Sequence, residues 1–240
     1  ETRLLGLRGL HTDAVRQSDM ARARALAEEA VRINPKVSWA SKAVLSYQST
    51  SQDWDAISHT IDTQKSAALI DKAAANRKHA VVLTAQALEA DAKNAEDAYD
   101  LALRAHKLDP SLVPAAIIAA RHAAHDGSLR KAARILEKTW NLTPHPDLAE
   151  AYGHIRQGDS ALDRLKRIRS LVGKSGGIES AVALATAAIE ALEWKAAREA
   201  LGAAARPMGK WNKLAQSRLV WDNIRLRASV GEKHPFIDKQ

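Results

Sequence analysis

The sequence has no cysteine, which excludes disulfide bonds, thiolate metal sites, iron–sulfur clusters, cysteine nucleophiles and covalent c-type haem attachment. Phenylalanine occurs once and tyrosine three times in 240 residues, and β-branched residues are scattered, so the composition disfavours a core built on a β-sheet. The longest apolar run, residues 112–120, contains Pro114 and is too short to cross a bilayer. The chain begins at Glu1 without a signal segment, and we expect it to be a fragment of a longer protein.

Motifs that would carry catalysis are also missing. The run GKSGG at residues 173–177 resembles a phosphate-binding loop, but that loop needs a glycine at position 168, where the chain has Ile168. No G-x-G-x-x-G dinucleotide motif occurs, and no carboxylate pair or triad stands out from the sequence. We therefore predict that the protein is not an enzyme, and we expect neither a metal site nor a resident cofactor.

Alanine is abundant, filling about a fifth of the chain, and the net charge of +8 is unevenly distributed. Residues 1–120 carry 15 basic and 15 acidic side chains, whereas residues 121–240 carry 21 and 13. A basic half can attract an acidic protein, anionic lipid or nucleic acid, and it can equally be an ordinary solvated helical surface. Because aromatic residues do not alternate with the basic ones, we do not expect nucleic acid to bind.

Internal repeats set the predicted fold. Pro110 and Pro144 lie 34 residues apart, as do Asp19 and Asp53, and 34 residues is the period of the tetratricopeptide repeat. That repeat uses small residues where its two helices cross and a proline where its second helix ends. The units fall at residues 4–37, 38–71, 79–112 and 113–146, and the last unit carries the small residues and the stop best: Ala120, Ala132, Thr139 and Pro144.

We therefore predict an all-α protein, a right-handed superhelix of antiparallel helix pairs. Residues 1–146 form tetratricopeptide-like repeats, residues 147–206 form irregular helical repeats, and residues 207–240 form a capping helix (211–229) and a tail. Polar or glycine-containing turns are expected near residues 94, 126 and 157. Trp54 and Trp194 should begin second helices, and most tryptophans should pack between helices.

The predicted partner-binding groove lies on the face built from first helices, with Arg121 and His125 among its contacts. These residues are four apart on one helix face, and we expect Ala120 and Ala124 to pack away from the groove. Arg121 could hold a carboxylate of a partner, or it could pair with an acidic residue of the neighbouring repeat. We expect Asp147 to cap the helix that follows the repeat stop.

Two further sets of residues are candidates. Arg130, Lys131 and Arg134, continued by Lys138, form a possible anion-binding surface on a second helix, and residues 164–169 form another basic cluster. Among the nine histidines, only His122 and His125 are closely spaced on one helix. In an alternative interpretation the domain carries haem or a porphyrin, with one of these two histidines as the haem ligand.

The segment LVPAAIIAARHAAHDGSLRKAARILEKTWNLTPHPDLAEAY (residues 112–152), with RLLGLRGLHTDAVRQSDMARARALAEEAVRINP (residues 3–35) before it, resembles the tetratricopeptide region of the HemY family of proteobacterial inner-membrane proteins. This resemblance implies a membrane anchor upstream of residue 1, a helical-repeat domain in water, and a role in organising protein partners in late haem and porphyrin biosynthesis. A cytoplasmic position is our preference for the domain. A flavin-dependent oxidase shares the family name, but this chain lacks its glycine motif.

Overall fold

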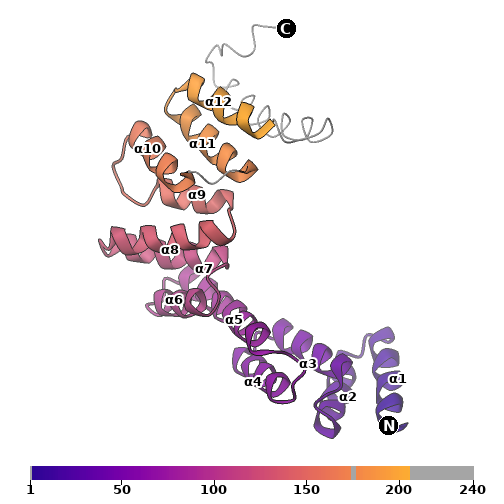
Figure 1. Cartoon of the computed structure of the whole chain (residues 1–240). Helices are drawn as coiled ribbons and strands as arrows, with labels where there is room; N and C mark the ends of the chain where they lie inside the picture. Colours follow the sequence, from indigo (N-terminus) through magenta and orange to yellow (C-terminus); the bar gives the residue numbers. More distant parts are fainter. Residues whose placement is uncertain (1, 174–176, 206–240) are drawn as a thin grey trace. The chain divides into compact units, whose positions relative to one another are not determined.

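The computed structural model describes residues 2–173 and 177–205, and this part of the chain contains twelve α-helices and no β-strand (Figure 1). The predicted all-α class is confirmed. The predicted capping helix at 211–229, with Trp211 and Trp221, lies outside the described residues. The helices are α1 (Thr2–Arg16), α2 (Met20–Ile33), α3 (Ser38–Thr50), α4 (Trp54–Ser66), α5 (Lys72–Ala92), α6 (Ala98–Leu108), α7 (Val113–His125), α8 (Leu129–Leu142), α9 (Pro146–Gly153), α10 (Ala161–Val172), α11 (Ile178–Glu190) and α12 (Trp194–Ala205).

The chain divides into two compact units, one ending at Gln157 and the other beginning at Gly158. In the first unit each helix from α1 to α9 packs on the next, in chain order. The alternate helices α5, α7 and α9 also contact one another, so the first helices of successive pairs form one continuous layer. This is the arrangement of a tetratricopeptide-like solenoid. In the second unit α11 packs on both α10 and α12.

The helix pairs follow the predicted repeat intervals with one difference. The pairs α1–α2, α3–α4 and α7–α8 occupy the intervals that begin near residues 4, 38 and 113. Helix α5 begins at Lys72, seven residues before the predicted unit at 79, because Asp71 caps it by accepting a hydrogen bond from the Ala74 N–H at 2.7 Å. The third pair therefore has a first helix of 21 residues, longer than the repeat requires.

The turn inside each of five pairs has the same backbone geometry. One residue takes a left-handed conformation, and the next N–H donates to the carbonyl five residues back, as in the Schellman motif. In the α7–α8 turn Gly127 has φ of 76°, and the Ser128 N–H donates to the Ala123 carbonyl at 2.8 Å. The equivalent left-handed residues are Ser18, Gln52, Asn94 and Leu192, none of them glycine. The turns expected near 94, 126 and 157 are all present, the last with Gly158 at φ of 83°.

Small residues stand where the helices of a pair approach each other. Ala120, Ala132 and Thr139 of the α7–α8 pair are all buried, as the repeat pattern predicts. The same holds for the earlier pairs at Ala23, Ala30, Ala98 and Ala105. Alanine at these positions lets two helix backbones approach closely, and larger residues fill the space between successive pairs.

The tryptophans mostly pack between helices, as predicted. Trp140 is almost fully buried in α8, Trp39 packs against the cluster of Leu7, Ala30 and Ala40, and Trp54 packs against the cluster around Ile57 and Ile61. Trp54 and Trp194 begin the second helices α4 and α12.

The start of α9 differs from the prediction for Asp147. The cap is His145, whose Nδ1 accepts a hydrogen bond from the Asp147 N–H at 3.2 Å. Pro146 then occupies the first helical position, where its missing N–H costs nothing and its fixed φ suits a helix. Asp147 therefore lies inside the first turn of α9, and its side chain is exposed.

Candidate partner-binding groove

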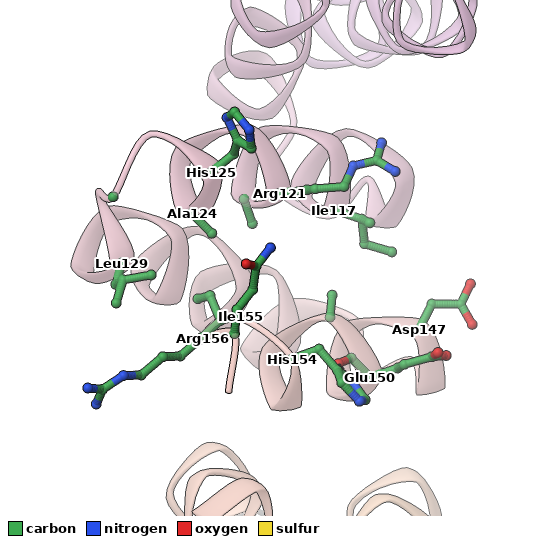
Figure 2. Close-up of a pocket in the computed structure, with 14 residues that line it drawn as sticks. Ile117, Arg121, Ala124, His125, Leu129, Asp147, Glu150, His154, Ile155 and Arg156 are labelled. Carbon is green, nitrogen blue, oxygen red and sulfur yellow. Dashed lines mark hydrogen bonds between the residues drawn. The ribbon is translucent and has the colours of Figure 1, made fainter. Parts of the chain in front are cut away.

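A groove of about 1010 Å³ lies between α7 and α9 in the first unit, on the layer formed by first helices (Figure 2). Its floor is apolar, and both walls carry charged or polar side chains. The residues that line it are Ile117, Ala120, Arg121, Ala124, His125, Gly127, Leu129, Asp147, Glu150, Ala151, His154, Ile155, Arg156 and Gln157.

The α7 wall contains both predicted contact residues, Arg121 and His125. The expectation that Ala120 and Ala124 pack away from the groove is wrong, because both also line it. Residues three and four apart share one face of a helix, so Ile117, Ala120, Arg121 and Ala124 belong to one stripe. The alanines provide a low surface between the longer side chains.

Arg121 makes an ion pair with the neighbouring repeat. Its guanidinium donates to the Asp91 carboxylate at the end of α5, while its side chain remains 58% exposed. His122 places Nε2 3.0 Å from the other oxygen of the same carboxylate. Asp91 therefore holds two consecutive α7 residues, and the pairing that was one alternative for Arg121 is present. The exposed part of the guanidinium still borders the groove.

His125 is far more accessible than its neighbour. Its side chain is 85% exposed, and its nearest ionic partner is Asp126, at 3.7 Å from Nδ1. The ring therefore keeps most of its surface available at the end of the α7 wall.

The α9 wall is acidic, and the sequence reasoning did not assign it to the groove. Asp147 and Glu150 are three residues apart on one face of α9, and both side chains are exposed (Figure 2). His154 follows them, with Nδ1 2.9 Å from the Glu150 carbonyl oxygen. A signal for this wall was present in the repeat: Ala151 lies 34 residues after Ile117, and both line the groove floor. Adding the period to the α7 positions would have found it.

The two histidines of the haem alternative have different surroundings. The His122 ring stacks on Tyr99 of α6 with centroids 6.1 Å apart, and its Nε2 faces Asp91. Only His125 lines the groove. In the described residues, no group of three or more histidine, aspartate or glutamate side chains is placed to hold a metal ion.

The two basic clusters differ in how they are neutralised. On α10, Arg167 donates to Asp159 and Lys166 lies 3.4 Å from Asp163. On α8, the exposed side chains of Arg130, Lys131, Arg134 and Lys138 form no salt bridge with any described residue. Only the α8 cluster keeps its charge unpaired within the described part of the chain.

No family model matches the chain, and no curated protein matches it either. Solved structures do match. PilW, described as a widely conserved type IV pilus biogenesis factor, is 17% identical and has a TM-score of 0.36, with 88% of this chain and 96% of that chain covered. For Pseudomonas aeruginosa pilF the values are 15%, 0.39, 97% and 98%. For a thermophilic TPR protein of Thermus thermophilus they are 16%, 0.33, 83% and 98%.

The helix pairs, their turns and their buried small residues define this protein as an all-α, tetratricopeptide-like helical-repeat protein. Across the described ranges, no helix combines the length and the apolarity needed to cross a membrane.

Proposed function

We propose that this chain is a non-catalytic scaffold that binds a segment of a protein partner in the groove between α7 and α9. The observation that carries the proposal is the groove itself, which has an apolar floor, a wall with Arg121 and His125, and an opposite wall with Asp147 and Glu150. An apolar centre bordered by polar side chains is the usual composition of a protein interface.

The acidic wall favours a protein segment over the other ligands. Phosphates of nucleic acid or the propionates of haem would face Asp147 and Glu150, and two carboxylates repel such groups. A polypeptide can instead present an acidic side chain toward Arg121 and a basic one toward Glu150, with a small apolar side chain over the floor. We propose an occupant with this alternation. Haem carriage, with His125 as the ligand in the groove, is the second candidate.

The identity of the partner is proposed from the sequence resemblance. Because residues 112–152 resemble the HemY family, we propose that the partners are enzymes of late haem and porphyrin biosynthesis. We further propose that the full-length protein is anchored in the bacterial inner membrane by segments upstream of residue 1, with this domain on the cytoplasmic side.

The test is to titrate purified late haem-pathway enzymes against the immobilised chain and its variants. Arg121→Ala should weaken binding about tenfold or more, which corresponds to about 1.4 kcal/mol or more, because a buried carboxylate of the partner would lose its cation. The matched control is Arg104→Ala on α6, since Arg104 is also exposed and also pairs with an acidic residue, Asp100 at 3.7 Å. Melting temperatures are measured for both variants.

The outcomes separate the parts of the proposal. Equal binding by Arg121→Ala and the native chain would remove the groove as the binding site. Failure of every haem-pathway enzyme to bind would remove the proposed partners. Titration of the chain with haemin tests the second candidate, because a Soret shift that His125→Ala abolishes would favour haem carriage over a protein groove.

A further inference from the structure

The surface of α8 that faces away from the fold carries a row of positive charge. One side of α8 is buried through Ala132, Ile135, Leu136, Thr139 and Trp140. The other side exposes Arg130, Arg134 and Lys138, spaced four residues apart, with Lys131 beside them. Four residues advance a helix by about 6 Å, so these three side chains follow one another along the helix at that interval. We call these four residues the α8 cationic row.

The row is not compensated by the rest of the described structure. None of its four side chains forms a salt bridge there. The nearest carboxylate on the same helix, Glu137, accepts a hydrogen bond from the Tyr152 hydroxyl of α9 at 2.6 Å. By contrast, Arg24 and Glu28 on α2 are a direct pair at 2.8 Å. The basic residues of α8 therefore have no acidic partner within the described chain.

One member of the row is held in place by an aromatic ring. The Lys131 ammonium lies 5.1 Å from the centre of the Tyr99 ring, which stacks on His122. This cation–π contact restricts the lysine side chain and lowers the entropy lost when a ligand binds. It also covers Tyr99, which is consequently not available for stacking on a nucleic acid base.

We propose that the α8 cationic row binds an acidic helical segment of a protein partner, with carboxylates four residues apart. A helix with glutamates at i, i+4 and i+8 has the same spacing of about 6 Å, so each carboxylate meets one basic side chain. This site is separate from the groove between α7 and α9, and neither depends on the other.

The geometry favours a protein segment over a membrane surface. A helix that binds a bilayer inserts its apolar face, but the apolar face of α8 is buried inside the fold. The charges form a line along one helix and not a broad plane. Two of the four are arginines, which can hold a carboxylate through two parallel hydrogen bonds.

The experiment uses two synthetic helical peptides of the same composition and net charge. One carries glutamates at i, i+4 and i+8, and the other carries them at scattered positions. Fluorescence anisotropy should show the spaced peptide binding at least about fivefold more tightly, and Arg134→Ala should reduce its affinity by about fivefold. Lys166→Ala on α10 is the control and should leave binding unchanged, because Lys166 already pairs with Asp163.

Three results would overturn the proposal. Equal binding of the two peptides would mean that the row attracts charge without a defined spacing. Unchanged affinity in Arg134→Ala, with the native melting temperature retained, would place the site elsewhere. Tight, Arg134-dependent binding to phosphatidylglycerol vesicles, with weak binding of the spaced peptide, would assign the row to a membrane surface.

Discussion

Replacing Ala132 by phenylalanine tests the packing on which the whole architecture depends. Ala132 is 0% exposed in α8, and α8 packs on α7, which contributes buried alanines of its own. A ring added there has no cavity to enter, so either the helices must separate or the side chain must take a strained rotamer. Overpacking of this kind costs about 1–3 kcal/mol, and the close approach of the two helices places this site near the upper end.

The cost should be visible in thermal unfolding followed by circular dichroism. One kcal/mol lowers the melting temperature of a domain of this size by about 2–4 °C, so Ala132→Phe should lower it by about 5–10 °C. The control is Asn141→Phe, which adds the same ring at an exposed position of α8 and should change stability by no more than about 0.5 kcal/mol. If Ala132→Phe unfolds at the native temperature, the α7–α8 register described above is wrong.

Two further predictions concern pH and the repeat turns. Burial, with the charge of Lys138, lowers the pKa of His106 below 6.5, although Asp109 opposes the shift. The unfolded chain therefore binds this proton more readily, stability falls as the pH drops through 6.5 toward the folded pKa, and His106→Gln should flatten the fall in melting temperature between about pH 7 and pH 5; an unchanged slope would contradict this assignment. At the turns, Gln52→Gly should stabilise the chain by up to about 1 kcal/mol, because Gln52 has φ of 54°, whereas Gly127→Ala should destabilise it by about 1 kcal/mol although no atom lies within 4 Å of the added Cβ. Urea unfolding measures both, and shifts of the same sign would refute the argument from backbone conformation.

The helices and their pairing could be predicted from the sequence because the repeat records them locally. Ala120, Ala132 and Thr139 stand at fixed positions in a 34-residue unit, and a close helix crossing leaves only small residues there. Such a pattern needs no knowledge of neighbouring repeats. It therefore survives even where a unit is degenerate, as at Gln64, which is buried in α4.

The candidate groove could be predicted only in part, because it depends on contacts between repeats. Arg121 and His125 could be placed on one helix face from their spacing, but the pairing of Arg121 with Asp91 required the position of α5 beside α7. The acidic wall required the position of α9, whose start was predicted with the wrong cap. Distances between residues about 30 positions apart follow from how successive pairs stack, and the period alone does not specify them.

The cationic row of α8 also acts on the helix that carries it. Like charges four residues apart on a helix destabilise it by about 0.2–0.5 kcal/mol per pair, and Arg130 with Arg134 and Arg134 with Lys138 make two such pairs. The free chain is therefore under a small electrostatic load that salt screens and that a bound anionic segment removes. Binding at this surface and folding of α8 are consequently linked, since whatever neutralises the row stabilises the repeat beneath it.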